Sequence, residues 1–227
     1  MTAQRWHIDP TNPGEVLACA GIAHLAWRAQ KDARTGFVDG ETFVVEDGPG
    51  DVFSMLRPME LHNAHHALLI CGARLDWWTE WGLSLAVKLW SGRQSAFTVH
   101  RSLINATKGT KPDEWLSHIA RTTGRLNVDT LGSWNALNIG WSINEHEHIR
   151  MLCRPWIELL SSFCLQVFAV PGKRGAPIRY TLWRPLSLPA AVAAFTGYGR
   201  GVYSDSQFEA LTADSGKNLL LTTARAM

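Results

Sequence analysis

The residues best suited to chemistry in this 227-residue sequence form a basic and aromatic group around position 90. Lys88, Trp90, Arg93 and Gln94 surround Gly92, which lets a ligand approach the backbone closely. A helix is expected to begin at Arg93 or Gln94, and a helix N-terminus beside Lys and Arg side chains is suited to binding phosphate. Trp90 could stack on a base or a sugar. The alternative is that Trp90 packs in the core and Gly92 only forms a turn.

Positive charge is concentrated in two segments of a nearly neutral chain, whose net charge is +2. Residues 88–125 carry seven bases and two acids, and residues 148–184 carry six bases and one acid. Such segments are typical of a face that binds a polyanion, although scattered surface charge would give the same numbers. We therefore add four bases to the expected nucleic-acid-binding residues: Arg101, Arg154, Lys173 and Arg174. The last two lie in the turn 172–175, which could contact phosphate or simply face solvent.

Histidines and cysteines form no convincing metal-binding or catalytic set. The four cysteines are far apart and form no CxxC motif, which predicts reduced thiols in a cytoplasmic protein. His62, His65 and His66 lack a nearby carboxylate or cysteine that would complete a ligand set, and residues 145–148 do not have the HExxH spacing of zinc enzymes. No Ser-His-Asp arrangement or phosphate-binding loop occurs. We expect no cofactor, no metal and no catalytic residue.

The elements that position these residues are predicted as a mixture of strands and helices. We expect strands over 5–9, 42–45, 66–78, 180–183 and 219–223, and a hairpin over 125–142. Helices are expected over 13–30, 94–107, 112–123, 146–168 (broken or started at Pro155) and 188–197. The first helix is well marked, because Asn12 is a good N-cap and Pro13 fits the first turn. This order predicts an α+β fold, mainly an antiparallel sheet with packed helices, of which an RNA-recognition-motif-like arrangement is one form.

The chain as a whole is typical of one globular unit. Its 46% hydrophobic and 19% charged residues are ordinary proportions, and no break in composition divides it. We predict a single elaborated α+β domain over residues 1–227. Residues 1–12 are polar and no apolar stretch is long enough to span a bilayer, so we expect a cytoplasmic protein that does not contact membranes.

Five short blocks of the sequence have a recognisable order and spacing. They are residues 8–14 continuing into 18–21, 75–78, 88–94, 137–142, and 154–160 followed by 180–185. Together they resemble a family of accessory, large-subunit-like proteins encoded with type I-U (I-G) CRISPR-Cas systems. The chain departs from the family in detail. It has Leu-Trp-Ser-Gly-Arg-Gln at 89–94 where the family more often has Thr-Trp-Ala-Gly-Gln-Gln, and Gly-Trp-Ser at 140–142 where Gly-Phe-Ser is frequent.

The resemblance implies membership of a type I RNA-guided DNA surveillance (Cascade) complex. Its expected partners are other Cas subunits, guide RNA and target DNA, with a helicase-nuclease recruited separately to degrade the target. The expected role is that of a non-catalytic nucleic-acid-binding subunit that contacts the backbone of guide RNA or target DNA. Two alternatives stay open. One is a metal-independent, RAMP-type endoribonuclease that processes guide RNA with His24 as general acid or base. The other is a structural scaffold whose tryptophans bury against partner subunits.

Overall fold

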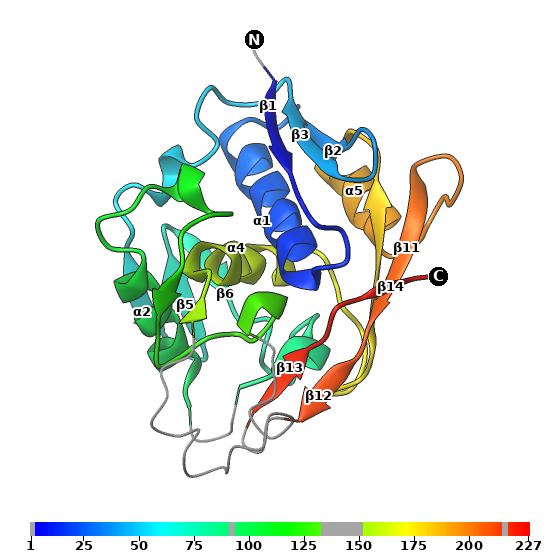
Figure 1. The fold of residues 1–227 in the computed structure, drawn as a ribbon. Coiled ribbons are helices and arrows are strands. Elements are labelled where there is room, and N and C mark those ends of the chain that lie inside the picture. Colours follow the sequence, from blue (N-terminus) through cyan, green and yellow to red (C-terminus); the bar gives the residue numbers. More distant parts are fainter. Residues whose placement is uncertain (1–2, 91–93, 133–151, 215–217) are drawn as a thin grey trace.

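The computed structural model describes residues 3–90, 94–132, 152–214 and 218–227 (Figure 1). Four helices lie in this part of the chain: α1 (Pro13–Ala29), α2 (Ala96–Ala106), α4 (Pro155–Leu165) and α5 (Leu188–Phe195). Short 3-10 helices are η1 (Ser54–Leu56), η2 (Leu85–Val87), η3 (Pro112–Glu114) and η4 (Thr130–Gly132). Figure 1 shows α1 and α4 near the centre of the molecule, with α2 on one side of them and α5 on the other.

The strands are short, and their bounds follow the chain. They are β1 (Gln4–His7), β2 (Arg34–Phe37), β3 (Thr42–Glu46), β4 (Leu61–Ala64), β5 (Ala67–Ile70), β6 (Ala73–Leu75), β7 (Ala120–Arg121), β8 (Leu152–Cys153), β9 (Ile178–Trp183), β10 (Leu186–Ser187), β11 (Ser204–Ala210), β12 (Thr212–Asp214), β13 (Leu219–Leu221) and β14 (Arg225–Ala226).

Within the described residues these strands form five small sheets. Their strand orders are β1-β3-β2-β10, β14-β11-β9, β4-β5-β6, β12-β13 and β7-β8. Every strand pair in them is antiparallel. The predicted α+β class with antiparallel pairing and packed helices is therefore confirmed. A single buried apolar cluster connects the elements, from Ile8 near the start of the chain to Ala224 near its end.

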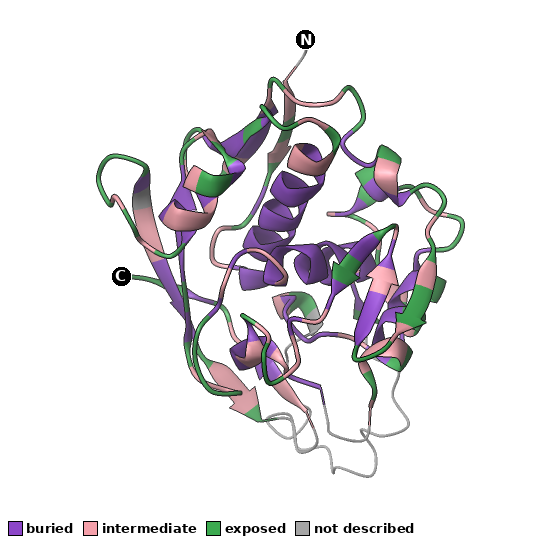
Figure 2. Ribbon diagram, turned by 180° about the vertical axis from the view of Figure 1, so that it is seen from behind, coloured by how far each residue is buried: buried purple, intermediate pink, exposed green. Residues whose placement is uncertain are grey.

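Helix α1 lies at the centre because its residues are small and apolar. Its N-cap is the predicted one: the side chain of Asn12 accepts a hydrogen bond from the backbone N–H of Gly14 at 3.0 Å. All residues over 13–26 are buried, and Figure 2 shows α1 and α4 almost entirely in the colour of buried residues. The backbones of the two helices touch at Gly21, where a Cβ would lie only 2.0 Å from the carbonyl oxygen of Leu160. A larger residue at this position would push the helices apart.

Three predicted elements differ from the structure in their described residues. The expected strand over 66–78 is a hairpin of β5 and β6, because the chain turns at Cys71 and Gly72 with φ values of 50° and 72°. The expected helix over 112–123 stops after η3, and the chain continues to β7, which pairs with β8. That pairing joins segments about thirty residues apart, so no local pattern could reveal it. The third is the hairpin over 125–142: its described part, residues 125–132, contains no strand and ends in η4. The predicted long helix begins at Pro155, as α4, after β8. Residues 133–142 and 146–151 lie outside the described residues.

Candidate nucleic-acid interface

The start of α2 forms one wall of a cavity of about 490 Å³ that is also lined by Lys88. The helix begins at Ala96 because Ser95 caps it: the N–H of Thr98 donates to Ser95 Oγ at 3.1 Å, and the N–H of Ser95 donates to Thr98 Oγ1 at 3.1 Å. Lys88 is half-buried and lines the same cavity as the first turn of the helix. Arg93 lies outside the described residues.

The turn 172–175 packs against the segment that carries Lys88. Arg174 Nε donates to the carbonyl oxygen of Lys88 at 2.7 Å, and its Nη2 donates to that of Trp90 at 3.2 Å. The N–H of Gly175 adds a bond of 3.2 Å to the carbonyl of Ala86. Arg174 is bound by backbone carbonyls, while Lys173 beside it is exposed. The fold thus brings together two predicted basic segments that are about 85 residues apart in the sequence.

The outward face of α2 is polar and basic, whereas its inward face is apolar. Its outward side chains follow helical spacing at Thr98, Arg101, Ser102 and Asn105. They line a cavity of about 420 Å³ together with Arg121 of β7. The guanidinium carbon of Arg101 lies 5.3 Å from the centre of the Phe97 ring, an arrangement that holds the side chain along the helix.

Further bases follow at the end of α2. Lys108 and Lys111 line a third cavity, of about 470 Å³, which they share with Arg57. Arg57 is neutralised, because it pairs with Asp51 at 2.9 Å and with Asp113 at 3.3 Å. We use the term α2 basic face for the remaining bases along the three cavities: Lys88, Arg101, Lys108, Lys111 and Arg121. Within the described residues, no carboxylate pairs with any of these five side chains.

Trp90 does not belong to this surface, and the prediction that it stacks on a base is wrong. The side chain is 1% exposed and packs edge-on against Trp77 and Trp78, with ring centres 5.5 and 6.4 Å away. The packing alternative holds because no face of the indole is accessible. Gln94 is half-buried, and its Nε2 donates to the carbonyl oxygen of Thr123 at 3.3 Å, which ties the start of α2 to the loop after β7.

Arg154 also lies away from the α2 basic face, and its assignment to phosphate binding is corrected. Its guanidinium binds Glu15 Oε1 at 2.6 Å and both oxygens of Asp129, at 2.7 and 3.0 Å. Asn12 Nδ2 adds a bond to Asp129 Oδ1 at 2.9 Å. Burial alone would lower the pKa of Arg154, but the two carboxylates raise it. The charge of Arg154 is neutralised by these two carboxylates inside the protein. The side chain thereby joins the N-terminal ends of α1 and α4.

Glu158, in the first turn of α4, completes this internal polar network. Its carboxylate accepts hydrogen bonds from four successive backbone N–H groups, those of residues 126–129. Burial raises the pKa of Glu158 to about 7, with the charge of Asp129 adding to the effect, while Arg125 and the backbone donors act in the opposite direction. The network fixes the loop before η4 against α4, which is a structural role.

The histidines considered as catalytic or metal-binding residues are either buried beside a backbone carbonyl or exposed. His24 is buried, and its Nδ1 lies 3.0 Å from the carbonyl oxygen of Phe163; burial lowers its pKa. His62, His65 and His66 are exposed. Among the described residues no cluster of three or more potential metal ligands exists. Residues 145–148 lie outside the described residues.

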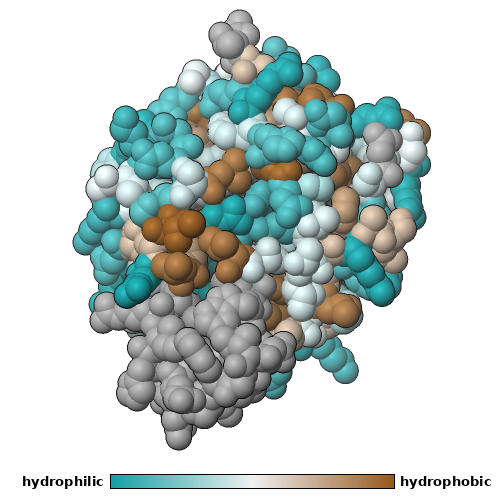
Figure 3. Space-filling model, in the orientation of Figure 1, coloured by the Kyte–Doolittle hydropathy of each residue, from teal (hydrophilic) through white to brown (hydrophobic). Residues whose placement is uncertain are grey.

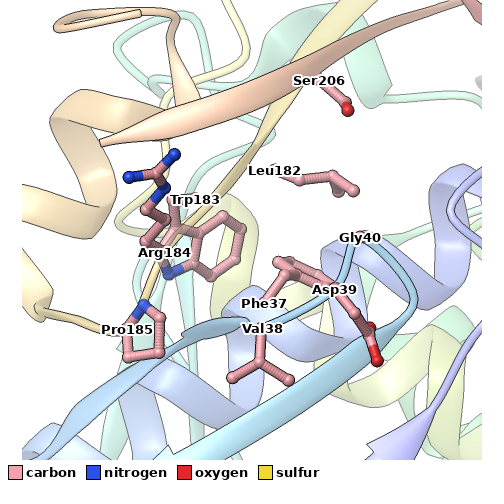
Figure 4. Close-up of a pocket in the computed structure, with 9 residues that line it drawn as sticks. All are labelled: Phe37, Val38, Asp39, Gly40, Leu182, Trp183, Arg184, Pro185 and Ser206. Carbon is pink, nitrogen blue, oxygen red and sulfur yellow. The ribbon is translucent and has the colours of Figure 1, made fainter. Parts of the chain in front are cut away.

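A further cavity, of about 460 Å³, separates the β2–β3 turn from β9 and β11 (Figure 4). Asp39 and Arg184 lie on opposite sides of it. The Asp39 carboxylate is already bound by the N–H groups of Glu41 and Thr42 and by the Thr42 hydroxyl, which lower its pKa. Because the Asp39 carboxylate is used in hydrogen bonds within the β2–β3 turn, this cavity offers fewer free polar groups to a ligand than the cavities along α2.

No known protein family, curated protein or solved structure matches this chain. Figure 3 shows one face of the molecule with mostly hydrophilic and neutral residues and a few hydrophobic groups. In the part of the chain that the structure describes, no helix is long and apolar enough to cross a membrane.

Proposed function

We propose that this protein is a non-catalytic nucleic-acid-binding subunit of a type I CRISPR-Cas surveillance (Cascade) complex in the cytoplasm. It contacts the phosphate backbone of guide RNA or target DNA through the α2 basic face. Its partners are other Cas subunits and the recruited helicase-nuclease. The observation that carries the binding is the set of five basic side chains that line three cavities around α2 and have no carboxylate partner in the described residues. The five sequence blocks support the assignment to the complex.

The physical basis of this binding is the release of counterions from the nucleic acid. Each Lys or Arg that neutralises a phosphate releases bound cations, so affinity falls steeply with salt. The amide of the exposed Asn105 lines the same cavity as Arg101 and Arg121 and suits phosphate or sugar oxygens. Such contacts hold the strand without reading it, which fits a complex whose sequence information comes from guide pairing.

The test is the salt dependence of binding by the purified protein. A labelled single-stranded RNA and a DNA duplex are titrated at several salt concentrations with wild type and with an Arg101→Ala/Arg121→Ala double variant. The double variant should reduce the slope of log K against log salt by roughly 1.4 on single strands and 1.8 on duplex. The matched control is Arg34→Ala/Arg225→Ala, which removes the same charge from exposed bases paired with Glu46 and Glu209.

An unchanged slope in the Arg101→Ala/Arg121→Ala variant would remove the α2 basic face from the proposal. Membership of the complex is tested separately, by purifying the tagged protein with the products of neighbouring genes and sequencing the bound nucleic acid. One uniform short RNA in that material supports the proposal. A monomer without RNA or partners contradicts it.

A further inference from the structure

Trp81 differs from every other tryptophan in the described part of the chain. Its side chain is 92% exposed, whereas the other described tryptophans are buried or half-buried. An indole in water is unfavourable, since a large aromatic side chain normally buries most of its area. An aromatic side chain of this size that is almost fully exposed therefore indicates a contact that forms only on binding.

The turn that carries Trp81 is held firmly. The N–H of Thr79 donates to the carbonyl oxygen of Asp76 at 3.0 Å, and the N–H of Gly82 donates to that of Thr79 at 2.9 Å. Gly82 lies directly on the backbone of Trp77, where a Cβ would come within 2.1 Å of the carbonyl oxygen. The indole is thus presented by a backbone that needs little further ordering when a ligand binds.

The same turn forms one wall of the cavity beside Lys88. Thr79 and Glu80, immediately before Trp81, line it together with the aromatic side chains of Trp78 and Phe97. Its volume of about 490 Å³ is within the range of ligand pockets, which is roughly 300–1,000 Å³. The cavity therefore combines aromatic surface, hydrogen-bonding side chains and one basic side chain, that of Lys88. These are the groups that an unpaired nucleotide needs.

We propose that Trp81 and this cavity bind unpaired nucleotides of a single strand, with one base stacked on the Trp81 ring and the next in the cavity. The inference rests on the proposed function, because Lys88 belongs both to the cavity and to the α2 basic face. Lys88 attracts the phosphate. Glu80 repels phosphate but can accept a hydrogen bond from an exocyclic amino group, so the base edge lies on its side. A strand whose phosphates follow the α2 basic face passes this cavity at the start of the helix.

The choice of a nucleic acid over a protein partner follows from charge. Trp81 directly follows Glu80, which lines the cavity together with Lys88, and Lys88 belongs to the α2 basic face, whose side chains have no carboxylate partner within the described residues. A polyanion with aromatic bases satisfies both features at once, whereas a protein would need an acidic strip beside a pocket for Trp81. Protein docking is therefore an outcome that the experiment must be able to detect.

The experiment compares two oligonucleotides of the same length and charge, one with bases and one abasic. Wild type should bind the base-bearing strand roughly 5- to 150-fold more tightly than the abasic strand. Trp81→Ala should lose most of that preference and keep the salt slope, while Trp81→Phe keeps part of it. Leu83→Ala, at an exposed residue of the same loop, is the matched control and should behave as wild type. RNA and DNA versions of both strands show which backbone is preferred.

The outcomes separate the two proposals. If wild type binds both strands equally and Trp81→Ala changes nothing, the stacking site is overturned and backbone binding stands. If wild type binds neither strand even at low salt, the proposed function fails and the stacking site with it. If Trp81→Ala leaves nucleic-acid affinity unchanged but loses a protein from the purified complex, Trp81 is a docking residue and the inference is wrong.

Discussion

The guanidinium of Arg154 holds both carboxylate oxygens of Asp129, with Nε 3.0 Å from Oδ2 and Nη2 2.7 Å from Oδ1. Only 13% of the Arg154 side chain and 1% of the Asp129 side chain are exposed. A paired fork of this kind is fixed in orientation as well as in charge. This pairing explains why Arg154, although it belongs to one of the two basic segments, stabilises the fold and is not available to a ligand.

Replacing Arg154 with Ala should lower the free energy of unfolding by about 3–5 kcal/mol, because Asp129 and Glu15 are left as buried unpaired charges. Urea denaturation at neutral pH measures the change. Arg179→Ala is the control: that side chain is 62% exposed in its pair with Glu209, so the change should be within about 1 kcal/mol. Equal losses in the two variants would contradict a buried structural role for Arg154.

Replacing Gly21 with Ala should destabilise the protein strongly, because the added Cβ would lie 2.0 Å from the Leu160 carbonyl oxygen. The helices α1 and α4 must separate to admit it, and we expect a loss of about 2–4 kcal/mol or failure to fold. Gly50→Ala is the matched control, since no heavy atom lies within 4 Å of a Cβ at that position. Thermal melting compares the two. A Gly21→Ala variant as stable as Gly50→Ala would show that the helices are not in contact.

His100 should make the protein less stable in acid. It is fully buried, with Nε2 2.7 Å from Ser162 Oγ, and burial lowers its pKa from 6.5 to about 4. Between these values the unfolded chain binds a proton that the folded protein excludes, so the free energy of unfolding falls as pH falls from 6.5 towards 4. A His100→Gln variant should lose roughly 2–3 kcal/mol less than wild type between pH 7 and 4.5.

The pH comparison between wild type and His100→Gln isolates the histidine. Glu158, whose pKa is raised to about 7, acts in the opposite direction: its burial destabilises the fold increasingly as pH rises from 4.5 to 7. That contribution is present in both proteins and drops out of their difference. Denaturant unfolding at four pH values provides the data. Parallel pH profiles would mean that His100 takes up its proton in the folded protein as readily as in the unfolded chain.

Trp90→Ala should reduce stability by about 3–5 kcal/mol, because the deletion opens a void between Trp77 and Trp78. The folded fraction should bind nucleic acid with the affinity and salt slope of wild type, since the ring is 1% exposed. Fluorescence anisotropy corrected for the folded fraction makes the comparison. Gln94→Ala, at the half-buried start of α2, should change stability by about 1 kcal/mol. Weakened binding by fully folded Trp90→Ala protein would show that Trp90 contributes to nucleic-acid binding.

Much of the local structure could be predicted from the sequence. The cap at Asn12 is a local signal, since capping depends on neighbouring residues. The α+β class likewise follows from the order of helix and strand patterns. The predicted strand over 66–78 is too long, because nothing in its apolar pattern shows that Cys71 adopts a left-handed conformation.

The residue types therefore account for the main helices and for the two segments in which positive charge is concentrated. Which of those charges are free depends on tertiary contacts. Arg154 and Arg101 look alike in the sequence, but Arg154 meets Asp129 across the core while Arg101 points outward from α2. Likewise Trp90 is enclosed and Trp81 is exposed, nine positions away. Burial and ion pairing depend on contacts between distant segments, and the residue types alone do not encode which of those contacts form.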